Sequence, residues 1–450
     1  MNPVAPGRPD PAIQFGLPAD DPLAARIFPA LPGEVKWGLG RTERLLAALQ
    51  DPHRTYPVLH VAGTNGKGSV ARIWSGILRA AGFRTGLYTS PHLISFRERI
   101  LVDRRPIPDE LLEEWARDLR PLLIRERPSF FEAATVLAFL AFARTEVDVA
   151  VVEVGMGGRL DATNVVSPVL TAVTNVAEDH MGILGGTVAE IAREKAGILK
   201  PGVPAFTASD DPIVLEILRN EAAAREALLS RVAQPAGRSG LEGSRFRMNT
   251  RRWGALELAS PLVGRHQLRN LALAIRSLEA LPPRLPVSGA AVREGVLRTR
   301  VAGRFQVERE GMRTWILDAA HNPAGVRALV RTLEEVRPAG PLIGVVGILR
   351  DKPWREMLTD LDGILDEVVL TGPGTAPRGR RWDPHEAAAA IPEGKARVVE
   401  NVSRAIEVAR ERAGTSGTVI VAGSAYTVGE ALQHLGRIPP EALPVPFESG

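Results

Sequence analysis

The residues from Gly63 to Ser69, with the sequence GTNGKGS, combine glycines, a lysine and a serine in a pattern that can hold phosphate. The common phosphate loop is G-x-x-x-x-G-K-[ST]. Here its first glycine would fall on Val61, and Gly68 separates Lys67 from Ser69. A buried strand is predicted before the loop and a helix after it, and backbone N–H groups at a helix start favour an anion. Lys67 would then bind the β- and γ-phosphates of a nucleotide, and Ser69 would bind Mg²⁺.

Acidic and histidine side chains lie in or after two further apolar runs. Glu153 lies in the otherwise apolar run VDVAVVEV, and a buried carboxylate is costly unless a cation accompanies it. Either Arg159 or a metal ion would meet that need, and a position near the end of a parallel strand beside a phosphate loop favours Mg²⁺. Asp179 and His180 follow the next predicted strand. There the histidine is equally compatible with a structural role and with a ligand role.

Lysine is scarce in this chain, and the lysines that remain are informative for that reason. Of the 56 basic residues, all but six are arginine. A retained lysine indicates either a compact charge beside phosphate or an amine that can be deprotonated and modified. Judged by its neighbours alone, Lys195 is more typical of a surface lysine paired with Glu194. The six lysines are Lys36, Lys67, Lys195, Lys200, Lys352 and Lys395.

The second half of the chain carries two polar motifs, each between a predicted strand and a predicted helix. ILDAAHNPAG places Asp318, His321 and Asn322 there, and AGSAYTVGEAL places Ser424 in the same kind of position. Ligands bind beyond the carboxyl ends of parallel strands, but neither motif by itself names a reaction. The sequence contains neither the nucleophile elbow G-x-S-x-G nor the zinc motif H-E-x-x-H.

Apolar runs alternate with helical periodicities along the chain. The strands and helices that this alternation predicts must position the motifs. It predicts an α/β protein whose N-terminal P-loop domain has a doubly wound, mainly parallel sheet, followed by a smaller C-terminal α/β domain. Short strands around 230–262 indicate an antiparallel flap. The predicted strands cover 57–62, 85–89, 147–154, 169–175, 314–319, 341–348, 366–371 and 417–422. The predicted helices cover 69–81, 131–143, 266–281, 323–336, 402–413 and 427–435.

Composition and segment boundaries narrow the class of protein further. We expect a flexible tail over 1–34, a first domain over 35–300, a second over 301–438 and a proline-rich tail over 439–450. The absence of cysteine excludes a disulfide scaffold, a thiolate zinc site and a cysteine nucleophile. Neither an apolar run of about 18 residues nor a signal-peptide pattern is present, so we expect no membrane partner and a cytoplasmic location. The net charge of +4 is small and interspersed, so we expect no nucleic-acid partner, and a monomer.

Taken together, the motifs resemble folylpolyglutamate synthase and dihydrofolate synthase, members of the Mur ligase superfamily. The resemblance covers nearly the whole chain. One departure is Ala319, where the family often has glycine, so the backbone there must keep a negative φ or accept strain. The stretches that carry the resemblance are HVAGTNGKGS, YTSPHL (88–93), FRERI (96–100), FFEAAT (130–135), EVGMGGRLDATN, DHMGILG, REKAGI, GRHQLRN (264–270), AGRFQ (302–306), DAAHNP and GSAYTVG.

The resemblance implies a reaction in which ATP phosphorylates a carboxylate of a folate substrate. The α-amine of L-glutamate then attacks the acyl phosphate, phosphate leaves and an amide forms. Phosphoryl transfer needs positioning and charge neutralisation more than covalent help. The implied partners are ATP as co-substrate, Mg²⁺ as cofactor, L-glutamate, and a folate or dihydropteroate. The RERI and AGRFQ stretches favour the bifunctional bacterial type. Whether the protein adds glutamate to dihydropteroate, to folate tails or to both stays open.

The resemblance also implies roles for particular residues. Carbamylation of Lys195 would create a carboxylate-like group that helps hold magnesium or the acyl phosphate. Lys67, carbamylated Lys195 and His321 are the implied catalytic residues. The implied nucleotide-binding residues are Thr64, Asn65, Gly66, Lys67, Gly68, Ser69, Asn270, Arg304 and Asp318. The implied metal ligands are Ser69, Ser90, Glu153 and His180, and the implied substrate-binding residues are Phe131, Arg97, His321 and Ser424.

Three other classes of protein share some of these features. A Mur-type ligase acting on a cell-wall precursor belongs to the same superfamily, but the TSPHL and DAAHNP stretches favour the folate ligase over it. A regulatory NTPase would need an arginine finger or a water-positioning glutamine, and no second substrate pocket. A nucleic-acid binder rests on arginine content alone. Phosphate release that depends on folate and glutamate would distinguish the folate ligase from the NTPase.

Overall fold

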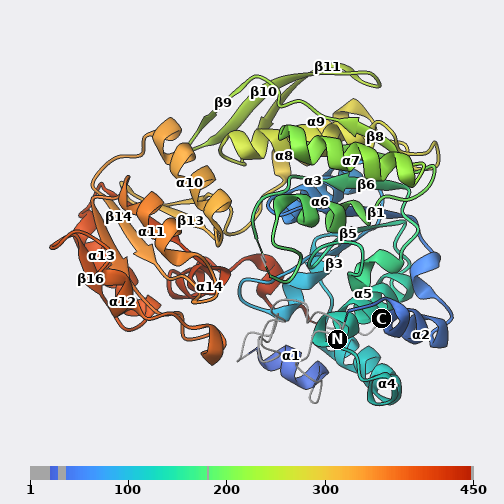
Figure 1. The fold of residues 1–450 in the computed structure, drawn as a ribbon, viewed down its shortest axis with the longest axis horizontal. Coiled ribbons are helices and arrows are strands. Elements are labelled where there is room, and N and C mark those ends of the chain that lie inside the picture. The colour runs from blue at the N-terminus through green and yellow to red at the C-terminus, as the bar shows by residue number, and fades with distance from the viewer. Residues whose placement is uncertain (1–20, 29–36, 180–181, 447–450) are drawn as a thin grey trace, which may run out of the picture.

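The computed structural model describes residues 21–28, 37–179 and 182–446. Two helix-covered sheets form an N-terminal and a C-terminal domain that lie side by side (Figure 1). The N-terminal sheet has eight strands in the order β4-β3-β2-β5-β1-β6-β7-β8. They are β1 (Val58–Ala62), β2 (Thr85–Tyr88), β3 (Ile100–Val102), β4 (Arg105–Pro106), β5 (Val149–Glu153), β6 (Leu170–Val173), β7 (Pro204–Thr207) and β8 (Leu228–Arg231).

Strand β1 lies at the switch point of this sheet. It is parallel to β5 on one side and to β6 on the other. The chain first builds β2 to β5 on one side of β1 and then builds β6 to β8 on the other. Only β3 and β4 are antiparallel to their neighbours. The predicted doubly wound, mainly parallel sheet is confirmed, and ligands bind at the carboxyl ends of strands around such a switch point.

Helices cover both faces of the N-terminal sheet (Figure 1), and most of them bury an apolar stripe against it. In α3 the stripe includes Ile73 and Trp74, and the Trp74 indole donates a 2.9 Å hydrogen bond to Ser277 Oγ on α8. Glycine allows α9 to approach α3 closely, since a Cβ on Gly295 would lie 2.5 Å from Ile77 Cα. The helices are α1 (Pro22–Ile27), α2 (Gly40–Ala48), α3 (Lys67–Ala80), α4 (Asp109–Glu126), α5 (Phe130–Arg144), α6 (Val188–Ala196), α7 (Pro212–Ala224), α8 (Arg265–Leu278) and α9 (Gly289–Arg298).

A three-stranded antiparallel sheet covers α8 and α9 and appears at the top of Figure 1. Its strands are β9 (Gly237–Gly240), β10 (Gly243–Thr250) and β11 (Gly254–Ser260). Phe246 and Met248 on β10 are buried, while the alternate residues Arg245 and Arg247 are exposed. This period of two is typical of a sheet with one covered face. The predicted flap is therefore confirmed for 237–260, whereas β8 belongs to the main sheet.

The C-terminal domain has a six-stranded sheet in the order β12-β13-β17-β14-β15-β16, parallel except for β12. Helices α10 and α13 begin with asparagine caps, and α14 begins with a serine cap. The strands are β12 (Gln306–Glu310), β13 (Arg313–Asp318), β14 (Leu342–Val346), β15 (Glu367–Leu370), β16 (Ala396–Val398) and β17 (Thr418–Ala422). The helices are α10 (Pro323–Val336), α11 (Trp354–Asp362), α12 (Pro384–Ala388), α13 (Val402–Ala413) and α14 (Ala425–His434).

Residues 21–28 contradict the predicted flexible tail over 1–34. They contain α1, whose residues Leu23 and Ile27 are buried against the N-terminal domain. Asp21 caps this helix and accepts a 2.9 Å hydrogen bond from Ala24 N. The prediction failed because six helical residues are too few to show a periodicity. The rest of that tail lies outside the described residues.

The predicted tail over 439–450 is also wrong in its first part. A turn of 3-10 helix, η5 (Pro440–Ala442), buries Glu441 and Ala442. Glu441 Oε1 lies 3.4 Å from Arg72 Nη1 on α3, so the chain returns from the C-terminal to the N-terminal domain. The other short 3-10 helices are η1 (Pro52–Arg54), η2 (Phe96–Arg99), η3 (Ala162–Val165) and η4 (Arg378–Arg380). In the described part of the chain, no helix has both the length and the apolar character needed to span a bilayer.

Candidate active site

The loop from Gly63 to Ser69 leaves the carboxyl end of β1 and enters α3. Gly63 has a φ of 148° and Gly66 a φ of 84°, values that favour glycine. A Cβ on Gly63 would also lie 1.8 Å from Thr174 Oγ1, so no larger residue fits. The Thr174 hydroxyl donates a 2.6 Å hydrogen bond to Asn65 O and fastens the loop to the end of β6.

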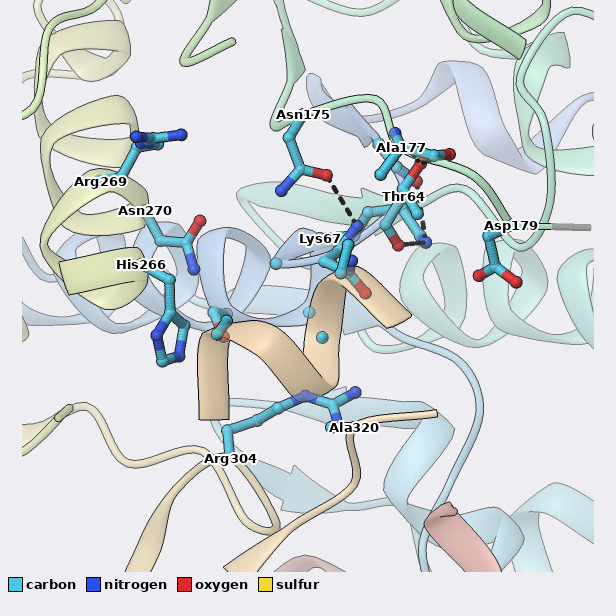
Figure 2. A pocket seen from close by; sticks show the side chains of 18 of the residues that line it. Thr64, Lys67, Asn175, Ala177, Asp179, His266, Arg269, Asn270, Arg304 and Ala320 are labelled. Atoms are coloured by element: carbon cyan, nitrogen blue, oxygen red, sulfur yellow. Dashed lines mark hydrogen bonds between the residues drawn. The ribbon is translucent and has the colours of Figure 1, made fainter. Parts of the chain in front are cut away.

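Asn175, one residue further on, holds the loop from the same side (Figure 2). Its backbone carbonyl accepts from Thr64 N, and its side-chain Oδ1 accepts from Asn65 N, both at 2.9 Å. The Thr64 hydroxyl donates to Ala177 O at 3.1 Å. Sequence reasoning gave Asn175 no role, although its place directly after a predicted strand was an available signal. These bonds fix the loop in a shape that can receive phosphate.

Two lysines converge on one carbonyl oxygen of the loop. Lys67 Nζ and Lys195 Nζ donate to Gly63 O at 3.1 and 3.0 Å. Lys195 is only 4% exposed, so the prediction of a surface lysine paired with Glu194 is wrong. Glu194 instead forms a 2.6 Å ion pair with Arg159. Burial, and then the charge of Lys67, lower the pKa of Lys195 from 10.5 to about 7, so its amine is about half neutral at pH 7.

Glu153 ends β5 beneath the phosphate loop. It is buried, and its Oε2 accepts a 3.2 Å hydrogen bond from Ser90 N. Burial raises the pKa of Glu153, while the charge of Lys67 opposes that effect. The alternative of an ion pair with Arg159 is wrong, because Arg159 is engaged by Glu194. Glu153 therefore faces the loop and Lys67.

The residues around Glu153 suit a small, hard cation. Ser69, Ser90 and Glu153 line the same cavity and offer two hydroxyls and a carboxylate. Mg²⁺ prefers oxygen donors and keeps several waters, so this donor set fits it. Among the described residues, no three His, Asp or Glu side chains gather as a metal cluster. The other implied ligand, His180, lies outside the described residues.

Three residues of the C-terminal domain face the loop, namely Arg304, Asp318 and His321. Asp318 accepts hydrogen bonds from Phe305 N at 2.8 Å and Ala320 N at 2.9 Å, and Arg304 lies in the same cavity. Burial raises the pKa of Asp318 to about 6, although the Arg304 charge opposes it. His321 Nδ1 lies 2.9 Å from a backbone carbonyl oxygen, and burial lowers the pKa of His321 to about 4. His321 is therefore neutral at pH 7.

These groups line one cavity of about 1000 Å³ between the two domains, a volume that accommodates a nucleotide-sized ligand. Figure 2 shows His266, Arg269 and Asn270 on one side and Arg304 on another. Asn270 donates to Gln267 Oε1 at 3.0 Å, and Gln267 Nε2 in turn donates to Ser69 Oγ at 3.3 Å. Sequence reasoning missed Gln267, for which only its place in the GRHQLRN stretch was a signal.

Three predicted substrate residues do not line this cavity. The Phe131 ring packs on Gly155 and lies 6.0 Å from the Tyr88 ring, next to the cavity rather than in it. The guanidinium of Arg97 binds Asp109, with Nε 2.7 Å from Oδ1. Ser424 is buried and caps α14 by accepting a hydrogen bond from a backbone N–H. Local structure thus accounts for Arg97 and Ser424 without a ligand.

The chain matches two domain families that together span the site. Residues 61–278 match the Mur ligase middle domain, and residues 303–425 match the Mur ligase glutamate ligase domain. These are the two bodies that meet at the cavity. The fold and the site therefore define a Mur-type ligase.

Individual relatives narrow the class. The chain is 34% identical to the dihydrofolate synthase/folylpolyglutamate synthase of Bacillus subtilis, over 89% of this chain and 95% of that one. It is 36% identical to the solved Mycobacterium tuberculosis folylpolyglutamate synthase complexed with ADP and AMPPCP, with a TM-score of 0.82 over 89% of this chain and 96% of that one. Escherichia coli FolC in complex with DHPP and ADP gives a TM-score of 0.81 at 30% identity, over 93% and 99% of the two chains. The chain belongs to the dihydrofolate synthase/folylpolyglutamate synthase family.

Proposed function

We propose that the interdomain cavity activates a folate carboxylate as an acyl phosphate and delivers it to the α-amine of glutamate. The chain is an ATP-dependent amide-bond ligase that joins glutamate to folates, as its family membership implies. The observation that carries the proposed mechanism is the shared cavity itself. In it the phosphate loop and a buried amine from one domain face Arg304, Asp318 and His321 from the other.

The phosphate loop provides the positioning that phosphoryl transfer needs. Its amides are held by Thr174 and Asn175, so little reorganisation is required when a nucleotide binds. Lys67 now donates to two loop carbonyls, and rotation of its side chain would bring the ammonium to the β- and γ-phosphates. Lys67 is a point charge there, which a bulkier guanidinium does not replace.

Mg²⁺ would be held by Ser69, Ser90 and Glu153, with His180 as a further ligand by family resemblance. When bound, the ion neutralises charge on the transferred phosphoryl group. Glu153 contributes a buried carboxylate whose position is fixed by Ser90 N. Removal of that charge should therefore affect the metal dependence before it affects the fold.

Lys195 is suited to carbamylation because its amine is buried and its pKa is lowered. The neutral amine attacks carbon dioxide, a C–N bond forms, one proton is released, and a carbamate with one negative charge results. That charge would lie next to Lys67, because both side chains now contact Gly63 O. The modified side chain would then help to hold magnesium or the acyl phosphate, as the family resemblance implies.

The C-terminal domain would orient the glutamate, whose α-amine accepts the acyl group. His321 is neutral at pH 7 and lies at the cavity, where its imidazole can accept a hydrogen bond from the α-amine of glutamate and orient it for attack. Phe131 beside Gly155 offers an aromatic face for the pterin. Arg97 and Ser424 are weaker candidates for substrate binding, because Asp109 and the start of α14 already engage them. We also propose that the protein is a cytoplasmic monomer, because the reaction consumes ATP and one chain contains every implied group.

A product assay tests this function. The full chain is incubated with ATP, glutamate and either dihydropteroate or tetrahydrofolate, and the glutamylated products are separated by chromatography. The bifunctional type predicts product from both substrates. Product from one substrate alone assigns the chain to that activity, and ATP hydrolysis that ignores both folate and glutamate contradicts the ligase function.

A further inference from the structure

Asp179 lies on the N-terminal side of the cavity and contacts three residues of the C-terminal domain. Its Oδ1 accepts from Lys352 Nζ at 2.6 Å, and its Oδ2 accepts from Asn322 Nδ2 at 3.1 Å. His321 Nε2 lies 3.8 Å from the same Oδ2. The side chains of Asp179 and Lys352 are 8% and 7% exposed, so this ion pair is largely removed from water. Figure 2 shows Asp179 at one edge of the cavity.

Asn322 connects this ion pair to the phosphate loop. The side-chain amides of Asn322 and Asn65 bond each other in both directions, at 3.0 and 3.2 Å. Asn322 Oδ1 also accepts from Gly325 N at 2.8 Å and caps α10. The backbone of Asn65 is in turn fixed by Asn175. A continuous set of hydrogen bonds therefore joins the start of a C-terminal helix to the phosphate loop.

We propose that Asp179 is a positioning residue for the ligation reaction, because it docks the C-terminal domain on the phosphate loop. Asp179, Asn65, Asn322 and Lys352 form what we term the interdomain latch. Removal of one partner from a buried ion pair leaves an uncompensated charge. Since this pair spans two domains, each with its own core, the cost falls on docking more than on the folding of either domain.

The latch has a consequence for nucleotide binding. The cavity is complete only when Arg304 and Asp318 face the phosphate loop. If only a fraction of the molecules is docked, the apparent affinity for ATP equals the affinity of the docked state multiplied by that fraction. Weakening the latch should therefore raise the KM for ATP while the docked molecules keep their turnover. A residue with a merely structural role would lower stability without this pattern.

The test compares Asp179→Asn and Lys352→Met with matched controls in a second ion pair. Lys395 and Asp362 form a 2.8 Å pair within the C-terminal domain, away from the cavity. Lys395→Met and Asp362→Asn make the same chemical changes there. We expect each latch variant to raise the KM for ATP by at least about tenfold, with a smaller change in kcat, and the controls to leave both unchanged. Lys352→Arg, which keeps the charge, should recover most of the loss.

Domain docking is measured directly by fluorescence transfer in the full chain. The sequence has no cysteine, so Ile213→Cys and Met312→Cys place one dye in each domain. Both positions are well exposed. We expect the transfer efficiency to shift in Asp179→Asn and to stay unchanged in Asp362→Asn. Nucleotide should return the latch variant toward the wild-type value, because the ligand contacts both domains.

Three results would overturn the latch. The first is an unchanged KM for ATP and an unchanged transfer efficiency in both latch variants. The second is a loss of kcat alone, which would place Asp179 in the chemistry instead of in docking. The third is full additivity in Asp179→Asn combined with Lys352→Met, since partners in one contact must be non-additive. If Asp179→Asn fails to fold, Lys352→Met carries the same comparison.

Discussion

Replacing Lys195 with arginine separates the charge of this residue from its reactivity. An arginine can still donate to Gly63 O, which Lys195 Nζ now contacts at 3.0 Å. It stays protonated in proteins and therefore cannot form a carbamate. We expect turnover to fall at least about a hundredfold, the loss typical of removing one group that stabilises charge in a transition state.

The environment of Lys195 determines the fraction of molecules in which its amine is neutral and can react. A lysine with an ordinary pKa of 10.5 is neutral in about one molecule in 3000 at pH 7. Burial and the Lys67 charge lower the pKa of Lys195 to about 7, so about one molecule in two carries a neutral amine. The site therefore raises the fraction able to capture carbon dioxide by about three orders of magnitude. Turnover that depends on carbamate should rise with pH through about 7.

The assay combines glutamate-dependent phosphate release with carbon-13 NMR in labelled bicarbonate. We expect a carbamate resonance in the wild type and in the control Lys395→Arg, and none in Lys195→Arg. Removal of carbon dioxide from the buffers should lower wild-type turnover, and bicarbonate should restore it. Near-normal activity of Lys195→Arg would refute the reasoning, as would a wild-type carbamate signal that persists in that variant.

The same pKa shift has a consequence for stability, with a definite sign. The folded pKa of the unmodified Lys195 is below its unfolded value, so the unfolded chain binds more protons between about pH 7 and 10.5. The free energy of unfolding should therefore gain a contribution from Lys195 that rises with pH across that window. Lys195→Met should remove this slope, as measured by denaturant titration of carbon-dioxide-free protein. An unchanged slope would show that Lys195 titrates normally in the fold.

Three further predictions concern other buried carboxylates. Glu153→Gln should raise the Mg²⁺ concentration needed for half-maximal turnover at least about tenfold with little loss of fold, and a grossly unfolded variant would point to a structural role instead. The pKa of Asp318 is raised in the fold, so its stabilising contribution is present at low pH and is lost as pH rises through about 6. Asp318→Asn should therefore remove a fall in the free energy of unfolding between about pH 4 and pH 6, and a variant with the wild-type pH profile would contradict this. Glu441→Gln should cost about 1 kcal/mol in urea unfolding, because its contacts to Arg72 and Arg104 are long, at 3.4 and 3.7 Å, and the amide oxygen can keep them; a loss above about 3 kcal/mol would mean that η5 anchors a larger unit.

The phosphate loop and its flanking elements were predictable because local pattern determines them. The strand predicted at 57–62 is β1, and the helix predicted at 69–81 is α3, each displaced by two residues or fewer. Scarcity of lysine was also informative. Lys67 and Lys195 lie at the cavity, and Lys352 lies in the interdomain latch.

The environment of Lys195 was not predictable from its neighbours, because residues far along the chain create it. The loop after β5 packs against the end of α6, where Arg159 N donates to Glu194 O at 2.8 Å. A Cβ on Gly158 would meet that same carbonyl at 2.7 Å, so only glycine allows this approach. A sequence window around Lys195 contains neither Gly158 nor Arg159. The interdomain latch escaped prediction for the same reason, since Asp179 and Lys352 are 173 residues apart.

Oxygen-18 transfer tests the central mechanistic claim most directly. Dihydropteroate or tetrahydrofolate labelled with oxygen-18 in the reacting carboxylate is incubated with the full chain, ATP and glutamate, and the released phosphate is analysed by mass spectrometry. If the carboxylate is phosphorylated and glutamate displaces phosphate, one labelled oxygen must appear in phosphate for each amide formed. Amide formation with unlabelled phosphate would contradict the acyl-phosphate mechanism.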